Sequence, residues 1–208
     1  MHKEIFENFI KEHFPTDSSL LMEMFEHYYS WLVKENQNIN LISRKTDMNT
    51  IWTRHFLDSI VPVPFISFDN KRILDFGTGG GLPGIPIAIL YPKADMSLLD
   101  SRKKKIGAIQ IAAQQLQCTN CSFFSCRIEE MGDQYTESFD IIVCRSVKMI
   151  PKYEKIVLNL LKPGGKLILY KSKNIADIAI FNNAIIHDKS TEQLGERKII
   201  EIVKDSTL

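Results

Sequence analysis

A glycine-rich loop flanked by acidic residues is the part of this sequence whose residue types and spacing best suit chemistry. The loop Gly77–Gly81 follows a short apolar run, Ile73–Phe76, and precedes Pro83 and Gly84. Glycine adopts positive φ angles at little cost and lets a ligand approach the backbone closely. Proline is tolerated in the first turn of a helix, because the N–H that it lacks has no partner there. This order of strand, loop and helix predicts a small-molecule site at a topological switch point of a sheet.

Two cofactors compete for such a loop. A dinucleotide enzyme uses the pattern G-x-G-x-x-G, but the sixth position counted from Gly77 is Leu82. Asp75, just ahead of the loop, would repel a pyrophosphate and instead suits the sulfonium and ammonium groups of S-adenosylmethionine. Asp100, at the end of the next predicted strand, can accept hydrogen bonds from ribose hydroxyls with either cofactor. We therefore predict S-adenosylmethionine, with a nicotinamide cofactor or a purely structural turn as alternatives. The predicted contacts are Asp75, Gly77, Gly79, Leu82 and Asp100.

The elements that must position this loop follow from the hydrophobic pattern after residue 70. Short apolar runs alternate with helical stretches, which predicts a parallel sheet with helices on both faces. The last two runs have no long helix between them, so we expect a closing hairpin with one antiparallel strand. The expected strands are 72–76, 96–100, 121–126, 139–144, 166–171, 183–188 and 198–204, and the expected helices are 84–91, 103–116 and 152–161. The tight turn Pro163-Gly164-Gly165 should lead into the fifth strand.

The first 66 residues are predicted to be helical. Apolar side chains from Leu20 to Leu32 recur at three- and four-residue steps, the spacing of one helix face, with Asp17 or Ser18 as the cap. A second helix is expected over 47–60, ended by Pro62, after a polar loop over 36–43. We therefore expect an α/β fold: a Rossmann-like class I methyltransferase sheet of seven, mostly parallel strands (residues 67–208, one compact unit) with an N-terminal helical cap (residues 1–66).

Composition narrows the function classes. The chain has 208 residues, 44% of them hydrophobic, with 26 Lys and Arg against 25 Asp and Glu. Because these charges nearly cancel, an RNA partner would require positive charge to be local. No apolar run approaches the length of a membrane span, and the N-terminus has no signal-peptide pattern, so we expect no membrane partner and a cytoplasmic location. For a chain of nearly neutral charge we expect a monomer. We expect no metal, because Cys118 and Cys121 lack a second ligand pair, and Cys126 and Cys144 are predicted to be thiols in buried strands.

Several segments in chain order resemble one family, the bacterial 16S ribosomal RNA guanine-N7 methyltransferase G family, also called glucose-inhibited division protein B. The segments that carry the resemblance span residues 40–197 and are Asn40-Leu41-Ile42-Ser43, Arg54-His55-Phe56-Leu57-Asp58-Ser59, the loop Asp75–Pro86, Leu99–Lys105, Cys126-Arg127-Ile128-Glu129-Glu130, Cys144-Arg145-Ser146-Val147 and Gly195-Glu196-Arg197. Three positions depart from the family pattern: Ser146 replaces an alanine, Ser172 a glycine and Lys198 a histidine.

The resemblance implies roles for individual residues. It places the cofactor against Gly77, Leu82, Ile128, Glu129 and Arg145. It also implies that Asn40, His55, Arg127 and Arg197 lie near the RNA or the reacting atoms. From the residues alone, His55 is better explained as a helix residue that orders the cap, and Asn40 is equally well explained as a loop residue that caps backbone groups.

The resulting hypothesis is a methyltransferase that modifies N7 of a guanine in 16S ribosomal RNA, as naked RNA or within a small-subunit particle. Guanine N7 already presents a lone pair, so its methylation needs no general base, and none is evident in the sequence. N7 lies on the major-groove edge, which is inaccessible in an A-form helix, so the base must be unpaired or flipped out. The alternatives are a cofactor-binding protein that assists ribosome assembly and, less favoured by Leu82, a nicotinamide-dependent dehydrogenase.

Overall fold

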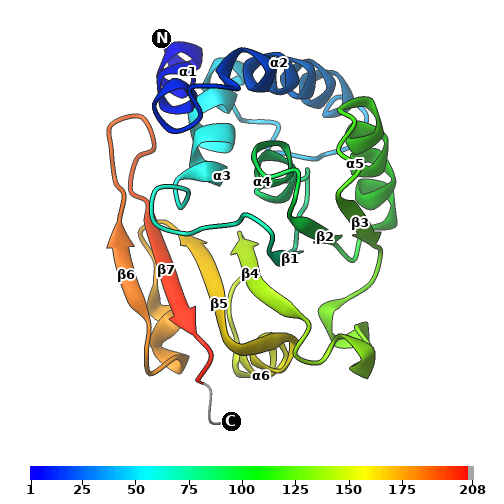
Figure 1. Ribbon diagram of the computed structural model, residues 1–208, viewed down its shortest axis with the longest axis vertical. Coiled ribbons are helices and arrows are strands. Elements are labelled where there is room, and N and C mark those ends of the chain that lie inside the picture. The colour runs from blue at the N-terminus through cyan, green and yellow to red at the C-terminus, as the bar shows by residue number, and fades with distance from the viewer. Residues whose placement is uncertain (206–208) are drawn as a thin grey trace.

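The structure, a computed structural model that describes residues 1–205, is built around one seven-stranded sheet. The strands are β1 Arg72–Phe76, β2 Asp95–Leu99, β3 Cys121–Phe124, β4 Phe139–Arg145, β5 Leu161–Lys171, β6 Ile185–Asp188 and β7 Lys198–Val203. They lie in the order β3-β2-β1-β4-β5-β7-β6 (Figure 1). Strand β7 is antiparallel to both of its neighbours, and the remaining pairs are parallel. The predicted mostly parallel, Rossmann-like sheet with a closing hairpin is therefore confirmed.

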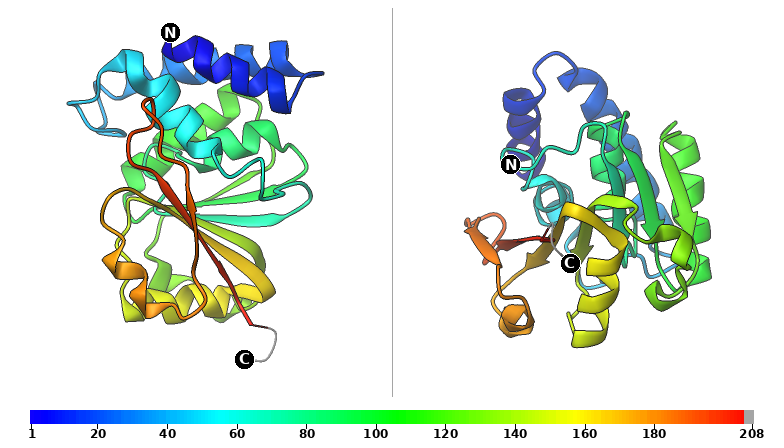
Figure 2. Two further views of the ribbon diagram at one scale, coloured as in Figure 1. Left: turned by 90° about the vertical axis from the view of Figure 1, so that its left-hand side faces the viewer. Right: turned by 60° about the horizontal axis from the view of Figure 1, so that its bottom comes forward.

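Helices cover both faces of this sheet. The helices are α1 His2–His13, α2 Ser18–Glu35, α3 Asp58–Ile60, α4 Gly84–Leu90, α5 Lys103–Gln115 and α6 Pro151–Leu160. Figure 2 shows α1 to α5 on one side of the sheet, and α6 with the 3-10 helix η5 (Ala176–Ile180) on the other. Two further 3-10 turns, η3 Ile128–Glu130 and η4 Asp133–Tyr135, follow β3.

Alternation of side chains along the strands creates two hydrophobic cores, one on each face of the sheet. Ile73 of β1 and Val143 of β4 face the core shared with α1, α2, α4 and α5. Leu74 and Ile142, the adjacent positions, face the core shared with α6 and η5. The first core continues without interruption into the N-terminal helices, and the boundary at residue 66 stays a prediction.

The N-terminal cap differs in detail from the predicted helix over 47–60. That stretch is divided into a 3-10 turn, η1 Met48–Thr50, a π-helical segment, η2 Trp52–Leu57, and the short α3. Asp47 begins it, because its Oδ1 accepts a hydrogen bond of 3.0 Å from the Asn49 backbone N–H. π-Helical turns occur frequently at functional sites, and this one carries His55, three residues ahead of Asp58.

Three further observations refine the sequence predictions. Strand β5 begins at Leu161, directly after α6, and Pro163–Gly165 form an irregular stretch inside it, where Gly164 has a φ of 73°. Cys144 is buried in β4 as predicted, but the prediction for Cys126 was wrong, because it is only partly buried and lies beyond the end of β3. No helix among the described residues is long and apolar enough to cross a membrane.

Replacing Phe6 should show how firmly the cap is held. Phe6 is fully buried, and its ring lies 4.7 Å from that of Phe25 and 5.6 Å from that of Trp52. Phe6→Ala should lower the free energy of unfolding by about 3–5 kcal/mol, because it leaves a cavity among aromatic rings. Urea denaturation measures this, with Leu20→Ala, at a 60% exposed position, as a near-neutral control. A loss equal to that of the control would contradict this account of the cap.

Candidate functional site

The carboxyl ends of three parallel strands meet beside the glycine loop. Phe76, the last residue of β1, is paired with Leu99 of β2 on one side and Cys144 of β4 on the other. The chain passes from β1 outward to β2 and β3 on one side and then crosses to β4 on the other side of β1. The carboxyl ends of β1 and β4 therefore form the predicted topological switch point. A cavity of about 600 Å³, called the loop cavity here, opens at this place. That volume lies within the range of small-molecule sites.

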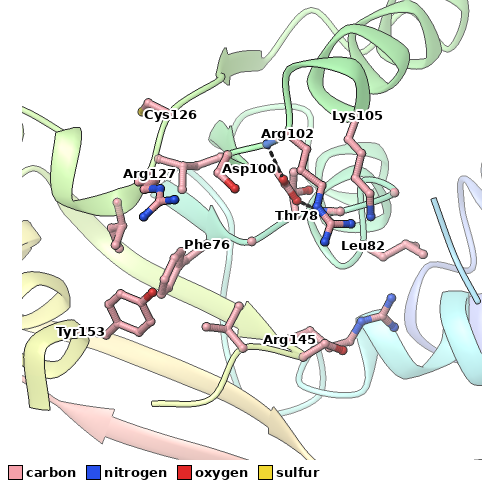
Figure 3. A pocket seen from close by; sticks show the side chains of 18 of the residues that line it. Phe76, Thr78, Leu82, Asp100, Arg102, Lys105, Cys126, Arg127, Arg145 and Tyr153 are labelled. Carbon is pink, nitrogen blue, oxygen red and sulfur yellow. Dashed lines mark hydrogen bonds between the residues drawn. The ribbon is translucent and has the colours of Figure 1, made fainter. Parts of the chain in front are cut away.

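Residues from six segments of the chain line the loop cavity (Figure 3). Its lining residues are Leu41, Phe76–Gly80, Leu82, Leu99–Arg102, Lys105, Cys126–Glu129, Arg145–Val147 and Tyr153. Two acids, Asp100 and Glu129, therefore face several cations across the same space.

The loop has the backbone conformation that its glycines predict. Gly77, Gly79 and Gly81 have φ angles of 78°, 58° and 86°, in the region that side-chain-bearing residues rarely adopt. A Cβ atom at Gly77 would lie only 2.7 Å from Cγ2 of Val147. The cap also holds the loop, because the Tyr28 hydroxyl of α2 donates a 2.6 Å hydrogen bond to the Gly80 carbonyl.

Asp75 lies beneath this loop and not in the cavity. Its side chain is fully buried, and its Oδ2 accepts a 2.8 Å hydrogen bond from the backbone N–H of Gly84, the first residue of α4. A Cβ at Gly84 would lie 2.7 Å from that oxygen and 2.1 Å from Leu98, so the contact requires glycine. Burial raises the pKa of Asp75 to about 6. The predicted direct contact between Asp75 and a cofactor thus has no counterpart in the cavity lining.

Asp100 lies at the mouth of the loop cavity. Its Oδ2 accepts a 3.0 Å hydrogen bond from the Gly79 N–H, shown as a dashed line in Figure 3, and its Oδ1 accepts one of 2.8 Å from the Arg102 N–H. The same carboxylate therefore shapes the loop and faces the cavity. A carboxylate has about four acceptor positions, so these two bonds leave capacity for a hydroxyl donor.

The segment after β3 forms the opposite wall. Ile128 is almost fully buried and presents an apolar surface, whereas Arg127 lies exposed at the rim. Glu129 pairs with Lys152 of α6 at 3.0 Å, and the hydrogen bonds that it accepts hold its pKa below the usual value. An apolar surface next to an acceptor suits a purine ring with an exocyclic amine.

Arg145 extends from the end of β4 toward the cap (Figure 3). Its Nη1 lies 3.0 Å from Oδ2 of Asp58, a carboxylate that is only 1% exposed. The Nε of Arg197 pairs with the other oxygen of Asp58, and Nη1 of Arg197 donates a 3.0 Å hydrogen bond to the Lys171 carbonyl. One buried carboxylate thus joins α3, β4 and the residue that precedes β7.

A second cavity, called the β5 cavity here, adjoins the first. It has a volume of about 450 Å³ and shares Ser146 and Val147 with the loop cavity. Its other lining residues are Lys148, Tyr170, Lys171, Ser172, Asn174, Ala176, Asp177 and Arg197. A buried ion pair forms part of its wall, with Lys171 Nζ 2.6 Å from Asp177 Oδ2.

That ion pair fixes the segment between the two cavities. Asp177 Oδ2 also accepts a 2.7 Å hydrogen bond from the Met149 N–H, and Lys171 donates one of 3.2 Å to the Val147 carbonyl. Ser146, at the start of the segment, has a φ of 66°. A non-glycine residue in this region is held there by its surroundings, and such positions cluster at functional sites.

His55 lies apart from both cavities. It lines a third hollow of about 440 Å³ with Ser43, Lys45, Thr46, Asp47, Thr50 and Arg54. Burial, followed by the positive charges of Arg145, Arg197 and Arg54, lowers the pKa of His55 to about 3. Its Nδ1 is buried without a hydrogen-bond partner among residues 1–205. His55 is therefore neutral at physiological pH and a very weak base.

Asn40 is exposed. The capping of backbone groups in this loop, which was one explanation for Asn40, is performed by Asn36 instead. The side-chain oxygen of Asn36 accepts hydrogen bonds of 2.9 Å from the N–H groups of Leu41 and Ile42. This places Leu41 in the wall of the loop cavity, while Asn40 itself is outside that wall.

The structure thus gathers eight of the twelve predicted site residues around one cavity. Those eight are Gly77, Gly79, Leu82, Asp100, Arg127, Ile128, Glu129 and Arg145. Arg197 lies in the β5 cavity, Asp75 below the loop, and Asn40 and His55 in the cap. Asp58, Val147 and Tyr153 were not among the site residues predicted from the sequence. Asp58 lies inside the quoted segment Arg54–Ser59, which was the available signal.

The sheet order and the switch-point cavity define a class I methyltransferase fold. Magnesium protoporphyrin IX methyltransferase from Synechocystis PCC 6803, solved with bound S-adenosylmethionine, is similar with a TM-score of 0.59 over 96% of this chain and 97% of that one, at 19% identity. The tRNA (m1A58) methyltransferase from Aquifex aeolicus gives a TM-score of 0.54 over 72% and 68%, at 15% identity. At these identities the likeness concerns the fold.

The family follows from sequence relatives. A family model described as rRNA small subunit methyltransferase G matches residues 21–203. Proteins named ribosomal RNA small subunit methyltransferase G are 33% identical over 178 residues in Streptococcus pneumoniae R6, covering 84% of this chain and 75% of that protein, and 33% identical over 195 residues in Macrococcus caseolyticus, covering 88% and 82%. The chain belongs to the rRNA small subunit methyltransferase G family, and the predicted resemblance is confirmed.

The pH dependence of stability tests the position of Asp75. The pKa of Asp75 is higher in the folded protein, at about 6, than the ordinary value of 3.8, so the folded state holds the proton more tightly. Ionisation of Asp75 should therefore cost stability as the pH rises from 4 to 7, by at most about 3 kcal/mol. Asp75→Asn, which keeps an acceptor for Gly84, should become more stable relative to the wild type over that interval.

The measurement is urea denaturation at several pH values, with Asp69→Asn at an exposed position as the control. A difference between Asp75→Asn and the wild type that does not change with pH would contradict the raised pKa of Asp75.

Proposed function

We propose that the protein transfers a methyl group from S-adenosylmethionine to N7 of a guanine in 16S ribosomal RNA. The observation that carries the proposal is the loop cavity, which combines a glycine-rich wall, an acid after β2 and an arginine at the end of β4 in a chain of this family. The partner is the RNA or a small-subunit particle that contains it. We propose that the enzyme acts as a monomer in the cytoplasm, where its substrate is found.

The residues present fit this cofactor. Asp100 retains acceptor capacity for ribose hydroxyls, and Ile128 with Glu129 offers an apolar surface and an acceptor for adenine. The backbone of Gly77 and Gly79 lets the amino-acid part approach closely. Leu82 and Arg145 complete the proposed set of contacts. Asp75 acts indirectly in this proposal, because it fixes the junction between the loop and α4.

The proposed reaction requires positioning and electrostatics from the protein. S-Adenosylmethionine supplies a methyl group on a sulfonium, and guanine N7 accepts it with its own lone pair. The chain therefore needs to align the two reactants and to stabilise the charge as it moves. The low pKa of His55, about 3, agrees with a role for this residue other than proton transfer.

The β5 cavity is the proposed place of the acceptor base. It adjoins the loop cavity across Ser146 and Val147, so a planar base there lies next to the sulfonium end of the cofactor site. Arg197 provides a cation at this position, and Arg127 and Arg102 do so at the rim of the loop cavity. Arginine pairs with phosphate through two parallel N–H groups, which suits an RNA backbone around a flipped-out base.

Binding and product analysis together test the proposed function. Calorimetry should show binding of S-adenosylhomocysteine and none of NAD, and mass spectrometry of 16S ribosomal RNA from a strain without the gene should show one N7-methylguanine fewer. Complementation with the gene should restore that nucleotide. Binding of NAD alone would point to a dehydrogenase. Binding of S-adenosylhomocysteine with an unchanged set of N7-methylguanines would point to an assembly protein.

Filling the β5 cavity tests the acceptor site. Ser172→Trp places a large ring in this cavity and not in the loop cavity, so methylation of small-subunit RNA should fall about 100-fold while affinity for S-adenosylhomocysteine is retained. Ser19→Trp, on an exposed part of α2, should change neither quantity. Full methylation by Ser172→Trp would exclude this cavity as the place of the base.

A further inference from the structure

Among the acids in the described part of the chain, Asp58 is the one that pairs with two arginines. It is 1% exposed, and each of its carboxylate oxygens faces a different guanidinium group. Within residues 1–205, it is the only carboxylate that pairs with either Arg145 or Arg197. His55, one turn earlier, adds no charge to the cluster, because its pKa is about 3.

The two arginines that Asp58 holds lie in different cavities. Arg145 lines the loop cavity with 12% of its side chain exposed, and Arg197 lines the β5 cavity with 16% exposed. Most of each side chain is thus immobilised, while a small part of it can meet a ligand. The two guanidinium groups repel each other, so without a carboxylate between them at least one must move.

We propose that Asp58 is a positioning residue whose single carboxylate sets the arginine of the loop cavity and the arginine of the β5 cavity at the same time. This inference rests on the proposed function, in which the first cavity takes the cofactor and the second the guanine. Asp58 makes no contact with either reactant. It fixes the distance between the two cations around them, and an error of about 1 Å in such positioning costs about 100-fold in rate.

Replacement of Asp58 and replacement of Arg197 should have different effects. Arg197→Ala removes one partner and leaves the pair between Asp58 and Arg145 intact, so methylation is lost while affinity for S-adenosylhomocysteine stays within about twofold. Asp58→Asn releases both arginines. It should weaken S-adenosylhomocysteine about tenfold, the loss of one hydrogen bond to a charged group, and also lower kcat for RNA methylation about 100-fold.

A matched control separates positioning from general destabilisation. Ile60→Ala lies two residues further along α3, is fully buried, and contacts neither arginine through a hydrogen bond or ion pair. It should lower Tm yet leave both S-adenosylhomocysteine affinity and kcat unchanged below that Tm. Asp58→Glu, which retains the carboxylate, should recover part of the affinity and of kcat that Asp58→Asn loses.

The experiment measures Tm, the Kd of S-adenosylhomocysteine and the kcat and KM of RNA methylation for the wild type and these four variants. If Asp58→Asn fails to fold, Asp58→Glu and Arg197→Ala still decide, since the inference requires the first to affect both quantities and the second only methylation. Unchanged Kd and kcat in folded Asp58→Asn would overturn the inference, as would equal losses in Ile60→Ala. A wild type that binds S-adenosylhomocysteine but methylates no RNA would instead refute the proposed function.

Discussion

The hydrogen bond from the Gly84 N–H to the buried carboxylate of Asp75 is the contact on which the geometry of the cavity depends. It joins the end of β1 to the first residue of α4 at 2.8 Å, and so fixes both ends of the glycine loop between them. Position 84 requires glycine, because a Cβ there would collide with the carboxylate and with Leu98, and position 75 requires a side chain that accepts a hydrogen bond from the Gly84 N–H. Between these two ends the loop adopts positive φ angles at Gly77, Gly79 and Gly81, and it forms one wall of the cavity.

Keeping an acid at this position is unfavourable for stability. Complete burial raises the pKa of Asp75 to about 6, so the carboxylate is ionised at neutral pH against the tendency of its surroundings. An amide could accept the same hydrogen bond without that cost. A buried charge that is less stable than its neutral replacement is typical of functional sites. Here its negative field acts on the cavity through the loop, which agrees with a positively charged cofactor.

The sequence predicted the sheet well, because strand identity depends on local hydrophobic pattern and the parallel order follows from the alternation of strands and helices. The same reasoning failed where backbone geometry depends on tertiary packing. Residues 47–60 have the composition of an α-helix but adopt a π-helical segment and short turns. Strand β5 begins five residues earlier than its apolar run, because Leu161 pairs with Phe139 of β4 and the Gly164–Gly165 stretch bonds to Lys204 across the sheet.

The candidate site, like the fold, could be predicted where it depends on chain order and not where it depends on tertiary packing. Residues that follow strands β1 to β4 could be assigned from their place in the chain, since carboxyl ends of parallel strands converge. The role of Asp58 could not, because an acid on a helix is ordinarily solvated. Its meaning appears only once the ends of β4 and the residue before β7 are known to meet at α3.

The distribution of charge also accounts for the behaviour of His55. Burial, followed by the charges of three arginines, lowers its pKa to about 3, so the imidazole cannot serve as an effective base near neutral pH. Two of these arginines, Arg145 and Arg197, share the single carboxylate of Asp58, so this cluster between the cavities carries a net positive charge. This charge contributes to keeping the nearby imidazole neutral, and in the proposed function it also attracts the phosphate backbone of the RNA. A reaction at a nitrogen that already carries a lone pair is compatible with both effects, whereas a reaction that required removal of a proton by His55 is not.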